Sequence, residues 1–302
     1  MKNPIIDELL KLKLISKLKL VTLQNTTRDK KIKVIQDSKT DIIFLEKYIT
    51  SNDYYRSLNY KDDEQKILRK LKNKLINVKT ISGNIKVPLI DDDSRRADQF
   101  EKYFKNKDIL DFGCGWGGFL LRIKKYKSLS GIELRKECIN HIQKNIKKID
   151  ISNNITSFEK KFDIITMFHV LEHIPYQVDT LKVLRSKLKN KGKIIIEVPH
   201  AKDFLIKQDE LKKFKNFTFW SEHLILHTYK SLKVILLKSG FKNINIKYYQ
   251  RYDFSNHLGW FLKGKAGGER TYKKIISDEL NLSYCKNLKR LGQTDTLIAI
   301  AE

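Results

Sequence analysis

The sequence has few cysteines, few arginines and no long apolar segment, and each shortage argues against a class of protein. Three cysteines at unrelated spacings provide neither a disulfide framework nor a cysteine-based metal site. A reducing, cytoplasmic location is therefore expected. No stretch approaches the roughly 20 apolar residues that a membrane-spanning helix needs, and the first residues lack the basic and then apolar order of a signal peptide.

Arginine supplies only 11 of the 61 basic residues, although the formal net charge is +26. The lysines are scattered along the chain, without an arginine-rich tract or an RNA-binding signature. A positive surface attracts anionic partners of several kinds. It attracts phosphorylated small molecules and nucleotide sugars as well as RNA. We expect a small anionic partner rather than nucleic acid. The sequence leaves the oligomeric state open.

A glycine-rich turn follows a short apolar segment that predicts a strand ending at Asp111. Glycine tolerates positive φ and lets the backbone approach a ligand closely, and a helix predicted to open at Phe119 would present free N–H groups above the turn. A second predicted strand ends at Glu133, about 20 residues further on, where a doubly wound fold binds ribose hydroxyls. The G-x-G-x-G spacing differs from that of pyrophosphate binders and favours a nucleoside cofactor without a diphosphate. The glycines of this turn are Gly113, Gly115 and Gly117.

The segment 109–117, together with Glu133, resembles the class I S-adenosylmethionine-dependent methyltransferases. The segment 162–174 is similar to the fourth strand and adjoining loop of that family, and 192–199 is similar to its fifth strand. The resemblance covers residues 95–302. It implies an α/β fold with a doubly wound, seven-stranded, mostly parallel and Rossmann-like sheet. It also implies S-adenosylmethionine as the cofactor and S-adenosylhomocysteine as the product.

Strands and helices alternate through this region, which is the order of a parallel sheet with right-handed crossovers. A helix is expected at 95–103 behind an N-cap at 91–94, and 155–158 is the candidate for the third strand. The resemblance implies that a seventh strand, at 294–301, inserts antiparallel between the fifth strand and a sixth at 243–252.

Residues 1–90 predict a small α+β extension, a possible substrate cover, ahead of the domain at 91–302. The segment 1–24 is predicted to be helical, because the alternating Leu and Lys residues of 9–23 suggest an amphipathic helix. The segment 31–45 predicts a hairpin, since two apolar runs flank residues suited to a turn.

Three further features bear on the substrate side. The apolar spacing at 64–75 predicts a helix, and the adjacent rings of Tyr54 and Tyr55 either cover a substrate cleft or pack in a core. An insertion at 255–293 separates the last two predicted strands. We expect it either to form part of the substrate-binding side or to be a passive helix on the surface.

The resemblance implies roles for individual cofactor-site residues. Glu133 is expected to accept both ribose hydroxyls. Asp111 is expected to contact the amino-acid end of the cofactor directly or through water, and its alternative role is to cap the glycine loop. Either Arg95 or Arg96 is expected to bind the cofactor carboxylate, with the other exposed. The adenine and sulfonium sides are expected to contact Ile155 and Phe168.

His169, Glu172 and His173 lie within one helical turn of one another after the fourth strand. A histidine here can act as general base, the three side chains can bind a divalent metal, or the Glu-His pair can hold the loop by hydrogen bonds. The block resembles the loop of ubiquinone-type O-methyltransferases and small-RNA 2′-O-methyltransferases, which carry Glu where this chain has His169. That difference weakens the case for a metal, and no metal site is assigned.

Two later histidines complete the catalytic candidates. His200 follows the fifth strand, at the edge of the sheet where ligands bind. His223 is the strongest single candidate for a substrate contact, with helix capping or packing as its alternative role.

The resemblance implies an enzyme that transfers a methyl group to an oxygen or carbon nucleophile. We expect a small, anionic acceptor such as a sugar or nucleotide sugar of surface-glycan biosynthesis. An RNA methyltransferase is the first alternative, and a non-catalytic regulator that binds the cofactor is the second.

Overall fold

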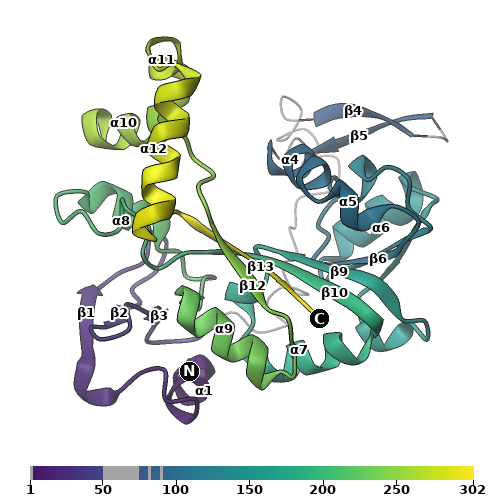
Figure 1. Cartoon of the computed structure of the whole chain (residues 1–302), viewed down its shortest axis with the longest axis horizontal. Helices are drawn as coiled ribbons and strands as arrows, with labels where there is room; N and C mark the ends of the chain where they lie inside the picture. The colour runs from purple at the N-terminus through teal and green to yellow at the C-terminus, as the bar shows by residue number, and fades with distance from the viewer. Residues whose placement is uncertain (1–2, 50–74, 81–82, 89–90) are drawn as a thin grey trace. The chain divides into compact units, whose positions relative to one another are not determined.

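The computed structural model describes residues 3–49, 75–80, 83–88 and 91–302 (Figure 1). Tyr54, Tyr55 and the predicted helix at 64–75 lie outside the described residues, except that Leu75 opens strand β4. Strands β4 and β5 pair antiparallel, and their bounds are Leu75–Thr80 and Gly83–Pro88. None of the helices that the structure describes is long and apolar enough to cross a membrane.

The central sheet has seven strands in the order β12-β13-β10-β9-β6-β7-β8 (Figure 1). Strands β6, β7, β8 and β9 pair parallel, whereas β13 runs antiparallel to β12. The last strand in sequence therefore lies between the fifth and the sixth, which confirms the predicted doubly wound sheet. The strand bounds are Asp108–Phe112 (β6), Ser128–Ile132 (β7), Ile149–Ser152 (β8), Phe162–Phe168 (β9), Leu188–Pro199 (β10), Asn245–Tyr249 (β12) and Thr296–Ala301 (β13).

The inner strands are almost continuously apolar because both faces of a parallel sheet are covered. In β10, Ile194, Ile195 and Ile196 are all fully buried. The helices that connect and follow the strands are α4 (Asp91–Gln99), α5 (Glu101–Phe104), α6 (Lys136–Asn145), α7 (Gln177–Ser186) and α9 (Tyr229–Lys238).

Two predictions around this sheet are corrected. The third strand is β8, and 155–158 instead contains the 3₁₀ turn η4 (Ile155–Ser157), because the Asn154 side chain accepts a hydrogen bond from the Thr156 amide and starts a turn there. Helix α4 begins at Asp91, so the acidic residues lie in its first turn and do not precede it as a cap. Negative charges in the first turn are stabilised by the positive end of the helix dipole.

The prediction of a helix through 1–24 is also wrong. Helix α1 (Pro4–Lys11) ends early, Lys13 adopts a positive φ of 55°, and the 3₁₀ turn η1 (Lys17–Lys19) leads into strand β1 (Leu20–Gln24). The alternating Leu and Lys residues lie mostly in α1, η1 and the turn between them, and only Leu20 of that pattern enters β1.

The predicted hairpin at 31–45 is confirmed as strands β2 (Val34–Asp37) and β3 (Ile43–Leu45). A four-stranded sheet forms in the order β1-β2-β3-β11, where β11 is Ile225–Leu226. Side chains of this sheet pack with those of the 201–219 segment in one apolar cluster that includes Val34, Leu45, Leu205, Phe214, Phe219 and Leu226.

The insertion at 255–293 is helical. Its helices start at side-chain N-caps, Asp253 for α10 and Ser277 for α12, and both end at a glycine with positive φ. The elements of this region, with the preceding α8, are α8 (Lys212–Thr218), α10 (Phe254–Lys263), α11 (Gly268–Tyr272), η6 (Lys273–Ile275) and α12 (Asp278–Leu291).

The chain divides into two compact units that do not follow the sequence boundary at residue 90. One unit contains 1–49, 169–182 and 196–301, and the other contains 50–168 and 183–195. The N-terminal hairpin therefore shares a unit with the loop that follows β9, and the division at residue 90 stays a prediction.

Candidate functional site

The glycine turn after β6 has the positive φ angles that its sequence predicts. Gly113, Gly115 and Gly117 have φ values of 86°, 54° and 78°, where a residue with a Cβ is disfavoured. The amides of Gly113 and Cys114 donate to the carbonyl of Ile132 at 2.8 and 3.0 Å, which fastens the turn to the end of β7. The helix predicted to open at Phe119 is only the 3₁₀ turn η3 (Leu120–Arg122). The glycine turn is therefore followed by a single 3₁₀ turn and not by a long helix.

Glu133 lies directly after β7 and its side chain is buried. One carboxylate oxygen accepts from the Gly115 amide at 2.9 Å, and the other accepts from the amides of Leu134 and Arg135 at 2.8 and 3.0 Å. The Arg135 guanidinium also donates to both oxygens, at 3.2 and 3.1 Å. Burial would raise the pKa of Glu133, but the charge and hydrogen bonds of Arg135 outweigh it and hold the pKa below its usual value.

Arg135 was not identified from the sequence. The sequence signal for Arg135 is its position two residues after Glu133. Side chains two residues apart in an extended segment point to the same side, so the arginine can bond to that carboxylate. A carboxylate has about four lone-pair sites, and those of Glu133 are already used by protein donors. A ligand hydroxyl at Glu133 would therefore compete with these protein donors, of which Arg135 supplies three bonds.

Asp111 is buried at the end of β6 and accepts from the Thr166 hydroxyl at 2.7 Å. Burial raises the pKa of Asp111 to about 7, and the nearby Asp93 carboxyl adds to the effect. Burial likewise raises the pKa of Asp93 to about 6. Among the described residues, the buried Oδ2 atom of Asp93 has no hydrogen-bond partner. Two buried carboxyl groups of raised pKa form a site that a cation would stabilise.

Asp93 was missed because its acidic run was interpreted only as a helix cap. The neighbouring arginines can now be distinguished. Arg95 donates to Asp92 at 2.9 Å and to Gln99 at 2.9 Å, along its own helix. Arg96 is buried and lies over the Phe168 ring, with 4.9 Å between the guanidinium carbon and the ring centroid. Arg96 is therefore the buried member of the pair, and its role with the cofactor stays a prediction.

Phe168, the last residue of β9, is enclosed by aromatic rings. Its ring lies 4.9 Å from that of Phe119 in an edge-to-face arrangement and 5.8 Å from that of Phe100 in a stacked one. Ile155 is half-buried in η4, which follows β8. The expected contacts of Ile155 and Phe168 with the cofactor stay predictions.

Glu172, His173 and His223 form a group that we call the histidine cluster. One potential metal-ligand atom of each residue lies within 4.8 Å of those of the other two. The ring centroids of His173 and His223 are 4.9 Å apart, and the Leu224 amide donates to the carbonyl of Glu172 at 2.9 Å. Within the described part of the chain, Glu172 Oε2 and His223 Nδ1 are buried without a hydrogen-bond partner.

The charges of the histidine cluster follow from its burial. Burial lowers the pKa of His223 to about 3, so the imidazole is neutral near pH 7. Burial alone would raise the pKa of Glu172, but the hydrogen bond from His169 and the neighbouring imidazoles lower it to about 2. A buried carboxylate beside a neutral imidazole can ligate a divalent cation.

His169 contacts Glu172, as its spacing predicts, but it is not one of the three cluster residues. Its Nδ1 atom lies 3.1 Å from Glu172 Oε1, and its Nε2 atom lies 3.2 Å from Glu197 Oε1 and 2.9 Å from Arg251 Nη1. Its backbone has a positive φ of 54°, held by the His169 amide donating to the Glu197 carbonyl at 2.8 Å. His169 thus orients Glu172, whereas His223 supplies the third member of the cluster.

Residues 1–49 hold the segment 220–224 that carries His223. Asp29 accepts from the amide and the hydroxyl of Ser221 at 3.1 and 2.6 Å. Further contacts come from Asn3 and Leu45, which bond to the backbone of Leu224, and from Arg28, whose guanidinium lies 4.6 Å from the Trp220 ring centroid. His223 is therefore placed by contacts from the start of the chain, and it lies in a loop before β11 rather than at the start of a helix.

His200 has contacts other than the histidine cluster. Its Nδ1 atom lies 2.8 Å from the Thr294 carbonyl, its ring lies 5.5 Å from that of Tyr248, and it forms a β-bridge with His227. Burial lowers the pKa of His200 to about 4. These contacts fasten the end of β10, and a catalytic role for His200 stays a prediction.

Comparisons with known proteins agree with this arrangement of glycine turn and sheet. Residues 91–246 match the profile of a methyltransferase domain. A tRNA U34 carboxymethyltransferase of Nautilia profundicola is 30% identical over 162 residues, which cover 46% of this chain and 49% of that protein. A mitochondrial ubiquinone biosynthesis O-methyltransferase of Saccharomyces cerevisiae is 33% identical over 91 residues, covering 26% and 29% of the two chains.

The chain spans about half the length of the tRNA-modifying relatives that it matches. Among solved structures, a SAM-dependent methyltransferase from Archaeoglobus fulgidus is 22% identical with a TM-score of 0.47, and the match covers 69% of this chain and 91% of that one. The domain profile covers more than half of the sequence. The chain therefore belongs to the class I S-adenosylmethionine-dependent methyltransferases.

Proposed function

We propose that this enzyme methylates a hydroxyl oxygen of a small, anionic acceptor, with sugars and nucleotide sugars as the first class. The observation that carries the proposal is the histidine cluster, which brings a carboxylate and two imidazoles together. A hydroxyl must lose its proton during methylation, and such a group provides a base or a cation site for that step. The net charge of +26 favours an anionic acceptor.

The residues around the glycine turn fit the cofactor. The positive-φ glycines allow close approach of its ribose and amino-acid parts, and Glu133 is assigned to the ribose hydroxyls. We assign Asp111 and Asp93 to the ammonium of the amino-acid end, because their raised pKa values would fall beside a cation. The bound cofactor supplies a methyl group activated by positively charged sulfur.

Arg96 is assigned to the cofactor carboxylate, since it is the buried member of the arginine pair. Ile155 and Phe168 are assigned to the adenine and sulfonium sides. Phe168 ends β9, and Glu172 of the histidine cluster follows four residues later in the sequence.

The histidine cluster also fits a divalent cation. Glu172 Oε2 and His223 Nδ1 are two buried lone-pair atoms without a hydrogen-bond partner among the described residues, and carboxylate with imidazole is a common donor set for such ions. Glu172, His173 and His223 would hold the ion, which would supply positive charge to the acceptor oxygen. Without an ion, His173 would accept the hydroxyl proton, and His223, whose pKa of about 3 makes it a weak base near neutral pH, would position the acceptor.

The test is transfer of labelled methyl groups from S-adenosylmethionine to a panel of nucleotide sugars, with and without excess chelator. We expect incorporation into at least one nucleotide sugar, and a large loss of turnover in His223→Ala while affinity for S-adenosylhomocysteine is retained. Melting temperature of each variant separates lost chemistry from lost folding. Incorporation only into a nitrogen or carbon acceptor, or full turnover in His223→Ala, would overturn the proposal.

RNA is the second candidate acceptor. It is favoured by the 30% identity to tRNA U34 carboxymethyltransferases over about half of each chain. Binding of RNA should weaken steeply with added salt, because counterions are released from the phosphate backbone. Methyl incorporation into bulk small RNA, absent from all nucleotide sugars, would establish this alternative.

A further inference from the structure

A pocket distinct from the glycine turn lies at the opposite end of the strands. It has a volume of about 530 Å³, within the range of roughly 300–1,000 Å³ common for ligand sites. Leu129 at the start of β7 lines it, whereas Glu133 follows the other end of that strand, about 13 Å away at the rise of a β-strand. The pocket is therefore distinct from the ribose site at Glu133, although its Arg122 guanidinium lies 4.0 Å from the carboxylate of Asp93, which is assigned to the cofactor ammonium.

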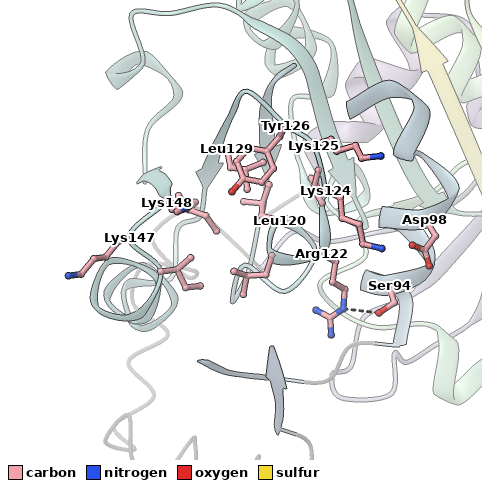
Figure 2. A pocket seen from close by; sticks show the side chains of 14 residues that line it. Ser94, Asp98, Leu120, Arg122, Lys124, Lys125, Tyr126, Leu129, Lys147 and Lys148 are labelled. Atoms are coloured by element: carbon pink, nitrogen blue, oxygen red, sulfur yellow. Dashed lines mark hydrogen bonds between the residues drawn. The ribbon is translucent and has the colours of Figure 1, made fainter. Parts of the chain in front are cut away.

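The rim of this pocket is positively charged. Four exposed lysines line it, two from the loop before β7 and two from the segment after α6, and we call it the lysine pocket. Figure 2 shows Lys124 and Lys147 on opposite sides of it. The lysines are Lys124, Lys125, Lys147 and Lys148.

Acidic residues neutralise little of this charge. Within the described part of the chain, none of these four lysines has an ion-pair partner within 4 Å, and Asp98 is the only carboxylate in the lining. The Arg122 guanidinium is held in place, because it donates to the Ser94 hydroxyl (Figure 2) and to the Gly118 carbonyl, both at 2.7 Å. Part of its charge is offset by the Asp93 carboxylate, which lies 4.0 Å away. Like charges gathered around a concave surface raise the local concentration of anions.

The floor of the lysine pocket is apolar. Leu120, Leu129 and Ile149 are buried beneath it, and the half-buried ring of Tyr126 lies beside them (Figure 2). The floor is open because the connection from β6 to β7 contains only the 3₁₀ turn η3 where a helix was expected. A bare inorganic anion would leave this apolar surface unused.

We infer that the lysine pocket binds a nucleoside phosphate, with the base on the apolar floor beside Tyr126 and the phosphates among the rim lysines. Stacking of a base on an aromatic ring and ammonium–phosphate bonds are the two interactions that this lining offers. The same chemistry is present in a free nucleotide and in a nucleotide of single-stranded RNA. The inference does not depend on which acceptor the enzyme methylates.

The test is a titration of the full chain with fluorescent N-methylanthraniloyl-ADP. Saturating S-adenosylhomocysteine is present, so that the nucleotide cannot bind through the cofactor site. We expect saturable binding that unlabelled ADP and UDP reverse. The double variant Lys124→Ser/Lys148→Ser should bind at least tenfold more weakly, on the order of one decade for each lost charge-assisted bond.

The matched control is Lys273→Ser/Lys274→Ser, which removes the same charge from exposed lysines of η6. We expect it to bind the nucleotide as the unmodified chain does, and we expect both double variants to retain affinity for S-adenosylhomocysteine. Equal weakening in the two double variants would reduce the effect to net charge and overturn the inference. Absence of saturable binding to the unmodified chain would also overturn it.

The apolar floor is tested separately. Tyr126→Ser should weaken ADP binding while leaving displacement by pyrophosphate unchanged. If pyrophosphate displaces the probe as well as ADP does, the pocket recognises phosphate alone and the inference fails. A ten-nucleotide oligouridine RNA that displaces the probe at lower concentration than UDP would identify RNA as the source of the ligand, whereas equal or weaker displacement would identify a free nucleotide.

Discussion

Replacement of Glu133 by Gln tests the assignment of the cofactor ribose. The carboxylate accepts five hydrogen bonds from three residues, Gly115, Leu134 and Arg135, at 2.8–3.2 Å. Gln keeps the shape of the side chain and one acceptor oxygen, but it removes the negative charge. Hydrogen bonds to charged groups contribute about 1.5–3 kcal/mol each, so loss of the ribose contacts should cost about 2–3 kcal/mol of binding free energy. That corresponds to a roughly 30- to 150-fold increase in the Kd for S-adenosylhomocysteine.

Isothermal titration calorimetry measures this change, and melting temperature reports whether the loop stays folded. Glu137→Gln is the matched control, because it removes one negative charge from the nearby first turn of α6. We expect the control to bind normally. An unchanged Kd for a folded Glu133→Gln variant would remove Glu133 from the cofactor site.

Arg135→Gln provides the converse experiment. If Arg135 competes with the ribose hydroxyls for Glu133, its removal should leave the affinity for S-adenosylhomocysteine equal or improved. If instead the ion pair at 3.1 Å is needed to hold the site, Arg135→Gln should weaken binding as Glu133→Gln does. The two variants together therefore distinguish a competing arginine from a supporting one.

Three further outcomes are expected. Gly115→Val should abolish cofactor binding, because a branched residue is strained at a φ of 54° and its side chain would block close approach of the ligand; calorimetry at unchanged melting temperature would show it. Chelator should remove activity and a divalent ion should restore it if the histidine cluster holds a metal, whereas full activity in excess EDTA would leave the imidazoles as bases. His200 and His227 both have a pKa lowered to about 4 by burial, so the unfolded chain binds more protons and stability falls as pH drops from 7 towards 5. The loss should be about 2 kcal/mol for each group, and denaturant unfolding of His227→Asn should show a shallower fall.

The cofactor side of the fold was predictable because its signals are local. A positive φ is required by the turn itself, so Gly113, Gly115 and Gly117 identify it without any knowledge of distant contacts. The alternation of elements likewise predicts a parallel sheet, whereas the place of the last strand was implied by the family resemblance. In contrast, the role of Asp93 depends on its burial near Asp111. Nothing in the acidic sequence 91–93 indicates that the two carboxyl groups are close.

The errors at 1–24 and 155–158 have a common physical origin. In both segments a short side-chain or backbone feature overrides apolar spacing: Asn154 caps a 3₁₀ turn, and Lys13 takes a left-handed conformation that ends the first helix. Apolar periodicity over so few residues fits a helix and a strand almost equally well, and turn chemistry then decides.

The histidine cluster shows why the catalytic side was only half predictable. Glu172 and His173 are adjacent, so their proximity is visible in the sequence, and His169 three residues earlier looked like the natural third member. The strained backbone of His169 instead directs its bonds to Glu172 and Glu197, and His223 takes the third place. That place depends on residues 1–49, which bond to the 220–224 segment through Asp29 and Asn3. The extension expected to cover a substrate thus supports a cluster residue more than 170 positions away, and no local pattern around His223 could reveal a support supplied from the start of the chain.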